Sequence, residues 1–291
     1  MLKIGQAQVT RIEEYLGPAF RSRDLLPDFD PRVVDEHRKW LVPDHYDEVN
    51  DQLVMSSHSW VVRVGGKVFL VDTCIGNGKS RPGIPLFDMA SLPYRTNLES
   101  SGLRVEEVDY VLCTHLHVDH VGWNTQLVDG QWVPTFPNAK YVFSKADHEF
   151  FDATTGAGAT DEITRNVYAD SVLPVIRTKQ DLQVDGDHDL GYGITVEPAP
   201  GHSPGHVLIR LGSSGMEGLF TGDILHHPIQ IYRPEWSSSS CSDPELARRT
   251  RRALLERAAE RGSFVMPAHF GGEHACRIAR TSQGFALRQA S

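Results

Sequence analysis

The stretch THLHVDHVGW, Thr114 to Trp123, gathers three histidines and an aspartate within six residues. These residues are His115, His117, Asp119 and His120, and they follow the apolar run YVLC, which is typical of a buried strand. Alternate side chains of an extended segment point to the same side, so His115 and His117 can face one point while Asp119 and His120 face a second. Imidazole and carboxylate groups are the ligands that zinc and related divalent metals prefer. The stretch therefore predicts a metal site where a strand ends.

Three further candidates for metal ligands each stand just beyond a predicted strand. His202 follows ITVEPAPG, Asp223 follows GLFTG, and His269 follows SFVMPA. The chain has 14 histidines, but an HxHxDH pattern arises by chance in only about one of several hundred such chains. Ligands at several strand ends indicate one rim of a layered fold, where loops on a rigid scaffold commonly build a site.

The size and charge of the chain restrict its function. With 291 residues, 40% of them hydrophobic, it can bury a sizeable core, and the absence of repeats and linkers favours one domain, residues 1–291. The formal net charge of -9 gives no basic footprint, so a nucleic-acid partner is not expected.

The cysteines and the N-terminus indicate a compartment. Cys74, Cys113, Cys241 and Cys276 form no CxxC pair, and free thiols are typical of a reducing compartment. The first residues lack the apolar core of a signal peptide, and no run approaches the roughly 18 apolar residues of a membrane span. We expect a cytoplasmic protein without a membrane partner.

Local patterns predict more strands than helices. We expect a hairpin over Trp60 to Asp72 that turns at Gly65-Gly66, and a helix from Ser242 or Asp243 to a stop at Gly262. Further predicted strands are QVTRIEEYL, YVLC, KYVFS, GITVEPA, HVLIRL, GLFTG and SFVMPA. Further predicted helices are Asp30 to Val42, capped by Asp30, and a short one capped by Asn97 that stops at Gly102. Single helices among many strands favour a layered α/β sandwich.

Five motifs resemble, in the same order, those of the metallo-β-lactamase-fold hydrolases. THLHVDH resembles the HxHxDH signature of that family, PAPGHSPGH its third-motif histidine, LFTGD its aspartate, PAHF its final histidine, and VDT an early aspartate that braces the metal loop. The resemblance runs from about Leu53 to His269 and comes nearest to the lactonase and organophosphate-hydrolase branch. It implies a four-layer αβ/βα sandwich of the α/β class, with the site along one edge.

The resemblance also implies a cofactor, two divalent metal ions, with Zn²⁺ expected and manganese, iron or cobalt as alternatives. His115, His117 and His202 would hold one ion, Asp119, His120 and His269 would hold the other, and Asp223 would bridge them. A hydroxide between the ions would be the nucleophile, because each ion lowers the pKa of bound water from 15.7 towards about 7. Asp119 would also move the proton.

The leading hypothesis is a metal-dependent hydrolase whose substrate is a lactone or another small carboxylic ester. A phosphotriester at the same site is the alternative, since the site suits a phosphoryl oxygen as well as a carbonyl. Iron-dependent redox chemistry is a third hypothesis, although its oxygen-reducing form needs a flavin domain for which 291 residues leave no room. β-Lactam hydrolysis is disfavoured by the expected location, and a non-catalytic binding module by the seven filled ligand positions. No GxSxG elbow offers a serine nucleophile.

Other histidines near the motifs have weaker signals. His226, three residues beyond Asp223, stands where lactonases of the family commonly carry a tyrosine, and a histidine there resembles the organophosphate-hydrolase branch. We expect His226 to donate a hydrogen bond to the substrate, against a packing role as the alternative. His206 is expected to make a hydrogen bond rather than bind metal. For His58, His227 and His274 a structural role is expected.

Segments outside the motifs allow only broad expectations. Residues 150–170 could form a flap over the rim or an ordinary surface loop. Trp123 and Trp236 could line the pocket, although buried tryptophans more often belong to a core. The first residues, an N-terminal extension of about 50 residues, could form a homodimer contact or a cap over the sandwich.

Overall fold

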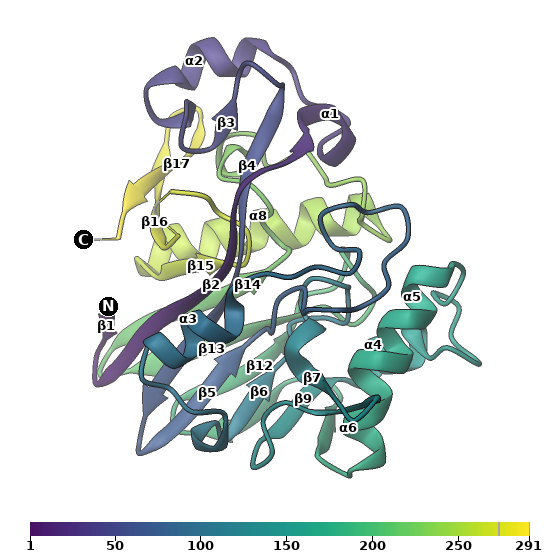
Figure 1. Cartoon of the computed structure of the whole chain (residues 1–291). Helices are drawn as coiled ribbons and strands as arrows, with labels where there is room; N and C mark the ends of the chain where they lie inside the picture. Colours follow the sequence, from purple (N-terminus) through teal and green to yellow (C-terminus); the bar gives the residue numbers. More distant parts are fainter. Residues whose placement is uncertain (273, 291) are drawn as a thin grey trace.

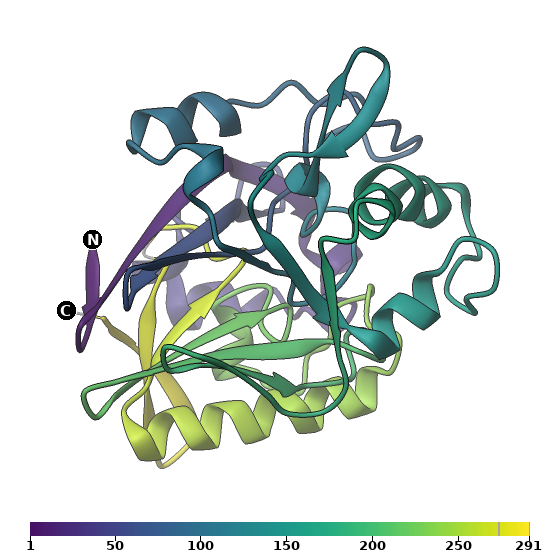
Figure 2. The same ribbon diagram turned by 90° about the horizontal axis from the view of Figure 1, so that it is seen from below.

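Two β-sheets packed face to face form the centre of the molecule, and helices cover both outer faces (Figure 1 and Figure 2). The computed structural model describes residues 1–272 and 274–290. This order of layers, helix, sheet, sheet, helix, confirms the expected four-layer α/β sandwich. Among the described residues, no helix is long and apolar enough to cross a membrane.

The first sheet has eight strands, and seven of them follow the order β1-β2-β4-β5-β6-β9-β10 while β3 pairs with β4. Their bounds are β1 (Leu2–Ile4), β2 (Ala7–Arg21), β3 (Tyr46–Asp47), β4 (Gln52–Val64), β5 (Lys67–Val71), β6 (Tyr110–Leu112), β9 (Lys140–Ser144) and β10 (Asp181–Val184). The predicted hairpin is β4 and β5, and Gly65 and Gly66 take φ angles of 59° and 76° at its turn. The long strand β2 pairs with β4 from Gln8 to Arg21, so much of the N-terminal extension belongs to the sheet.

The second sheet has seven strands in chain order, from β11 to β17. Their bounds are β11 (His188–Gly191), β12 (Ile194–Pro198), β13 (Val207–Ser213), β14 (Met216–Gly222), β15 (Phe264–Pro267), β16 (Cys276–Thr281) and β17 (Gly284–Gln289). A separate hairpin joins β7 (Thr125–Val128) and β8 (Gln131–Pro134).

Alternating side chains of the strands separate the core into layers. On β13, Val207, Ile209 and Leu211 enter the core between the two sheets, whereas Leu208 packs on the opposite face. On β5, Phe69 and Val71 enter the same inter-sheet core, and neighbouring residues of this strand face the other way. The period of two along each strand therefore fixes which face meets the partner sheet.

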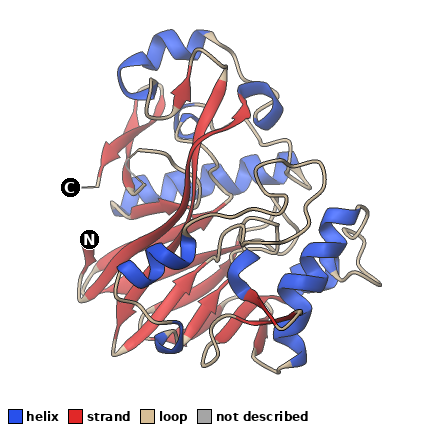
Figure 3. Cartoon of the chain, viewed as in Figure 1, coloured by secondary structure: helices blue, strands red, loops and turns tan. Residues whose placement is uncertain are grey.

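Helices cover the two outer faces and the end of the sandwich that carries β3, as the colours of Figure 3 show. Side chains from α3, α4, α5 and α6 join the core on the first sheet, α8 packs on the second sheet, and α1 and α2 form a smaller cluster with β3. The helix bounds are α1 (Ser22–Leu25), α2 (Arg32–Leu41), α3 (Tyr94–Ser100), α4 (Lys145–Phe151), α5 (Glu162–Val167), α6 (Leu173–Arg177), α7 (Ile229–Tyr232) and α8 (Pro244–Arg261), with short turns η1 (Val105–Glu107), η2 (Gly122–Asn124) and the π-helical η3 (Tyr168–Val172).

Helix ends agree with the sequence in one case and differ in two. At α8 the Asp243 carboxylate accepts the Leu246 N–H at 2.9 Å and Gly262 is left-handed, as predicted. The helix α3 begins at Tyr94, after Pro93, so the prediction that Asn97 caps its start is wrong. The Asn97 amide is inside the helix and donates to the Glu13 carbonyl at 2.8 Å.

The start of α2 also lies later than predicted. This helix begins at Arg32 and is preceded by Pro31, which makes no side-chain cap. Asp30 still accepts the Arg32 N–H at 3.0 Å, so its carboxylate satisfies a free donor of the first turn although it stands one residue further out than expected.

Candidate metal centre

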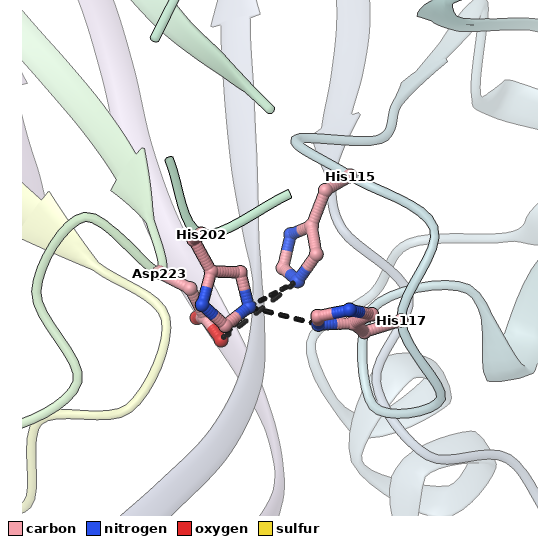
Figure 4. Close-up of side chains that lie close together, drawn as sticks. All are labelled: His115, His117, His202 and Asp223. Carbon is pink, nitrogen blue, oxygen red and sulfur yellow. Dashed lines mark hydrogen bonds and ion pairs between the residues drawn. The ribbon is translucent and has the colours of Figure 1, made fainter. Parts of the chain in front are cut away.

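The seven predicted ligands all lie in loops that follow strand ends. The loop after β6 carries residues 115–120, and the segments after β12, β14 and β15 carry His202, Asp223 and His269. The structure brings these loops together into two groups of side chains that could each hold a metal ion. Figure 4 shows four of the side chains converging, His115 and His117 from the loop after β6 and His202 and Asp223 from two other segments.

The first group contains His115, His117, His202 and Asp223. One ligand atom from each lies within 4.8 Å of every other. His202 Nε2 is 3.1 Å from His115 Nε2 and 2.8 Å from His117 Nδ1, and it is 3.2 Å from Asp223 Oδ2. Three ring nitrogens and one carboxylate oxygen therefore surround a single point (Figure 4).

The second group contains Asp119, His120 and His269, again with ligand atoms within 4.8 Å of one another. His120 Nε2 lies 3.1 Å from His269 Nε2. Asp223 joins the two groups, because its Oδ1 lies 3.0 Å from His269 Nε2 and 3.2 Å from His120 Nε2 while its Oδ2 faces the first group. One carboxylate thus offers an oxygen to each point.

The tautomers of two histidines show that these residues fit a cation. His120 Nδ1 donates to Asp72 Oδ2 at 2.9 Å, and His269 Nδ1 donates to the Ser56 carbonyl at 2.9 Å, since both partners only accept. In a neutral ring the Nε2 atom then carries a lone pair, and the two lone pairs face each other across 3.1 Å. Two lone pairs at that distance repel unless a positive charge lies between them. Buried Asp223 Oδ1 has no hydrogen-bond donor among the described residues, which adds to the same demand.

The pKa shifts of the histidines agree with a site that favours positive charge. Burial lowers the pKa of His115 and His202 well below the usual range, so their rings stay neutral and their lone pairs are available. Burial also lowers the pKa of His120 and His269, but nearby carboxylates, above all Asp223, outweigh it and raise both pKa values. The carboxylates of this site therefore favour any bound cation, whether a proton or a metal ion.

The ring nitrogens that face away from the two groups have partners of their own. Asp72 accepts hydrogen bonds from the Thr114 N–H at 2.7 Å and from His120, which is the bracing arrangement that the resemblance implies. His115 Nδ1 lies 3.1 Å from Thr114 Oγ1, and His202 Nδ1 lies 3.6 Å from the buried Cys241 thiol. Such partners fix the orientation of a ligand ring, and no sequence pattern indicates this role for Cys241.

Asp147 is a buried carboxylate that the sequence did not identify. It lies in α4, and it accepts the Leu116 N–H at 3.2 Å, the Ser203 hydroxyl at 2.9 Å and the Gly205 N–H at 2.6 Å. A side chain at Gly205 would meet the Asp147 backbone nitrogen at 2.3 Å, so glycine is required there. Asp147 thereby joins the loop of His115 and His117 to the loop of His202, and the motif GHSPGH contains the serine and glycine that contact it.

Glu14 is another buried carboxylate that the sequence did not identify. It accepts hydrogen bonds from the Ile75 N–H at 2.7 Å, the Gly76 N–H at 3.1 Å and the Trp123 indole at 2.6 Å. Burial raises the pKa of Glu14 to about 7, against these donors, which lower it. Ile12, two residues before Glu14 in β2, packs in the core between the first sheet and its covering helices. Because side chains two apart on a strand face the same side, this alternation was the available signal that Glu14 is buried.

The remaining histidines have distinct places. His206 Nε2 accepts the Asp223 N–H at 3.1 Å, and His227 Nε2 donates to the His45 carbonyl at 2.8 Å. His58 contacts the Ser56 hydroxyl at 2.6 Å and packs against His274 with ring centres 4.9 Å apart. These four rings lie outside the two groups, as expected. The ring of His226 does line the pocket, and its Nε2 is 3.2 Å from Asp223 Oδ2.

A pocket of about 340 Å³ opens above the two groups. Its floor includes His117, Asp119, His202, Asp223, His226 and His269. Its walls are mostly apolar and comprise Phe20, Leu25, Met55, Ile84, Phe87, Leu116, Val118, Phe151, Ile163 and Val167. The predicted segment 150–170 supplies part of this wall, largely from helices, whereas Trp123 and Trp236 lie in hydrophobic cores.

A model of the metallo-beta-lactamase superfamily matches residues 53–269. The chain belongs to this superfamily. It is 28% identical over 123 residues to an N-acyl homoserine lactonase of Bacillus cereus, which is 42% of this chain and 40% of that protein. It is 26% identical over 192 residues to the probable metallo-hydrolase YybB of Bacillus subtilis (strain 168), which is 64% of this chain and 72% of that protein. The matches to curated N-acyl homoserine lactonases span about two fifths to one half of those proteins' length.

Solved structures of the metallo-β-lactamase superfamily share the fold over the whole chain. The hydrolase AbOPH of the beta lactamase superfamily superimposes with a TM-score of 0.82 at 24% identity, covering 100% of this chain and 96% of that one. AidC, a dizinc quorum-quenching lactonase in complex with a product, superimposes with a TM-score of 0.76 at 18% identity, covering 100% and 96%. At these identities the likeness establishes the architecture.

Proposed function

We propose that the protein is a metal-dependent hydrolase of a small neutral ester, a lactone or another carboxylic ester. The observation that carries this proposal is the joined pair of ligand groups, which share Asp223 at the floor of an apolar pocket. The lactonases and hydrolases to which the chain is similar support the same reaction class.

The lining of the pocket favours a neutral substrate. Among the described residues that line it, none is a lysine or an arginine, and Asp24 is the one carboxylate outside the proposed ligand set. An anionic substrate would find no cationic side chain along the walls. An ester with an apolar group instead places that group against the walls and its polar bond at the floor.

The ligand assignment is part of the proposal. His115, His117 and His202 would hold one divalent cation, Asp119, His120 and His269 would hold a second, and Asp223 would serve both. Such a pair of cations supplies Lewis acidity and lowers the pKa of water, so that a nucleophile exists near neutral pH. Zinc suits the imidazole and carboxylate donors, as do manganese, iron and cobalt.

Two side chains of the floor would act on the substrate. The Asp119 side chain is 19% exposed, more than Asp72 or Asp223 at 5% each, so it can accept a proton from the attacking water and return it to the leaving oxygen. The backbone N–H of His226 donates to Gln230 Oε1 at 2.7 Å, which fixes the main chain at this residue. Neither ring nitrogen of His226 makes a hydrogen bond among the described residues, although Nε2 lies 3.2 Å from Asp223 Oδ2, so the ring can donate to the substrate oxygen.

A phosphotriester is the second candidate substrate, and the neutral pocket lining favours it equally. A phosphotriester is uncharged and carries apolar groups, as the walls require. The phosphoryl oxygen would take the place of the carbonyl oxygen beside His226.

A substrate panel tests the proposal. Purified protein is loaded with zinc, manganese or cobalt and assayed with γ-lactones, aryl esters and phosphotriesters, before and after chelation. We expect hydrolysis of at least one neutral ester class that chelation abolishes and metal restores. Preference for lactones and aryl esters supports the first candidate, preference for phosphotriesters supports the second, and no metal-dependent hydrolysis in any class contradicts the proposal.

A further inference from the structure

Two walls of the pocket come from segments that are distant in sequence. The irregular segment 75–93, between β5 and α3, carries Ile84 and Phe87, and the helix α5 carries Ile163 and Val167. In Figure 1 the loop that follows β5 lies beside α5. The space between these two walls determines the width of the group that the pocket can take.

One buried ion pair joins the two walls. The Arg81 guanidinium, in segment 75–93, donates two hydrogen bonds to Asp170, from Nη1 to Oδ2 at 2.8 Å and from Nη2 to Oδ1 at 2.7 Å. The Arg81 side chain is 0% exposed and that of Asp170 is 12% exposed. A bidentate pair of this kind fixes both the distance and the orientation of the two segments.

A second buried cation converges on the same carboxylate. Lys79 Nζ lies 3.3 Å from Asp170 Oδ1 and 2.8 Å from Thr125 Oγ1, and it stands 3.8 Å above the centre of the Trp132 ring. Asp170 thus meets two buried cations, and its removal would leave both without this carboxylate. Loss of one partner from a buried charge network is far costlier than loss of an exposed ion pair.

Within each segment, the backbone connects the ion pair of Asp170 with Arg81 and Lys79, here called the anchor, to the residues that line the pocket. In segment 75–93, the Gly78 N–H donates to the Ala90 carbonyl at 2.9 Å and the Met89 N–H to the Lys79 carbonyl at 2.8 Å, which closes the loop on itself. Ile84 and Phe87 therefore move with Lys79 and Arg81. On the other side, Asp170 lies in the π-helical turn η3, which continues α5 without a break and so moves with Ile163 and Val167.

We propose that Asp170 is a specificity-determining positioning residue, which sets the width of the pocket by holding segment 75–93 and α5 together through Arg81 and Lys79. The inference rests on the proposed function for the identity of the pocket as a substrate site. Narrow apolar groups are accepted in the anchored state, and bulkier groups enter only when the anchor is weakened.

Three variants separate this role from simple stabilisation. Asp170→Asn keeps the shape and removes the charge, and Arg81→Lys keeps the charge but loses the two-pronged geometry. Glu217→Gln is the matched control, because Glu217 also binds an arginine, Arg257 at 2.8 Å, but lies on the second sheet outside the pocket. Should Asp170→Asn fail to fold, Arg81→Lys carries the test.

The first measurement is amide hydrogen exchange, which needs neither metal nor activity. We expect exchange in residues 78–90 and in α5 to rise by about tenfold or more in both anchor variants, with no change there in the control. The second is calorimetric binding of uncharged alkanamides with linear and branched chains. The ratio of affinities for branched over linear chains should rise by about fivefold in the anchor variants, and the control should match wild type.

The outcomes distinguish this inference from the proposed function. Unchanged exchange in residues 78–90, or an unchanged ratio of affinities, would overturn the role of Asp170. If neither ester class is hydrolysed but exchange and affinity ratio change as expected, the proposed reaction fails while the role of Asp170 in the pocket stands.

Discussion

The floor and the walls of the pocket differ in the physical requirements that place their side chains. The floor consists of histidines and aspartates whose atoms must meet at fixed distances, and their orientation is held by partners such as Asp72 and Asp147. The walls consist of apolar side chains whose position follows from how segment 75–93 packs on α5. Reaction class and substrate range are therefore encoded separately, and changes in one region should leave the other largely intact.

The largest effect is expected at the floor, for Asp223→Ala. Because one oxygen of Asp223 faces each ligand group, its loss weakens both cation sites together. We expect at least one metal equivalent to be lost and kcat/KM to fall by about 10³-fold or more on every ester. Metal per chain by plasma mass spectrometry, with initial rates, measures both. Retention of two metals with wild-type turnover would show that Asp223 of the floor is not needed for the reaction, against the division of roles between floor and walls.

The carboxylate of Glu14 contacts both regions, since it binds Trp123 of the metal motif and Ile75 of the wall segment. Its pKa is about 7 in the folded protein against 4.5 in the unfolded chain, so the folded state binds the extra proton between these values. Glu14 therefore weakens folding as pH rises from about 4.5 to about 7, by on the order of 3 kcal/mol, and adds no further change above that.

Urea unfolding of metal-free protein at pH 5 and pH 8 measures this contribution of Glu14. We expect the free energy of unfolding to fall more between these pH values in wild type than in Glu14→Gln, whatever the absolute stability of the variant. Equal pH dependence in the two proteins would show that the carboxyl group is not protonated on folding.

The next effect is expected for His226→Phe, at the boundary of floor and wall. The variant removes a hydrogen-bond donor from the pocket and keeps an aromatic ring, so kcat should fall by about 10²-fold while metal content stays unchanged. His188→Gln, outside the pocket lining, serves as the control. Full turnover of His226→Phe on the best substrate would assign this ring a packing role.

The smallest effect is expected in the wall, for Phe87→Ala. Phe87 packs edge-on against Phe20 with ring centres 6.3 Å apart, and its removal widens the pocket without touching a proposed ligand. We expect kcat/KM for short esters to stay within about twofold of wild type, and that for bulky esters to rise severalfold. A uniform loss across all substrates would show that the wall also supports the floor.

The difference between floor and walls also explains what the sequence could predict. Proposed ligands such as His115 and His202 stand next to strand ends, so residue type and spacing predicted which side chains the structure brings together. The β4 and β5 hairpin and the helix α8 were equally predictable from local conformation. Gly65 and Gly66 take the positive φ angles of the turn, Asp243 caps the start of α8, and Gly262 takes the left-handed conformation at its end.

Other features depend on contacts that no local pattern contains. The start of α3 was misjudged because Asn97, a good cap by type, uses its side chain on the Glu13 carbonyl of β2. Asp147 and Asp170 look like ordinary helix aspartates, and only their distant partners, Gly205 and Arg81, reveal their burial. The wall residues carry no motif, since any apolar side chain of suitable size would serve.

The proposed centre requires that seven side chains hold two cations needed for the reaction, and metal content paired with turnover measures this. Protein purified in the presence of zinc is analysed for metal per chain and assayed on its best neutral ester, then chelated, dialysed and titrated with zinc. We predict close to two metal equivalents per chain, loss of hydrolysis on chelation, and recovery as about two equivalents are returned. Turnover that survives complete removal of metal, or a chain that binds no metal at saturating zinc, would show that these side chains do not form a catalytic metal centre.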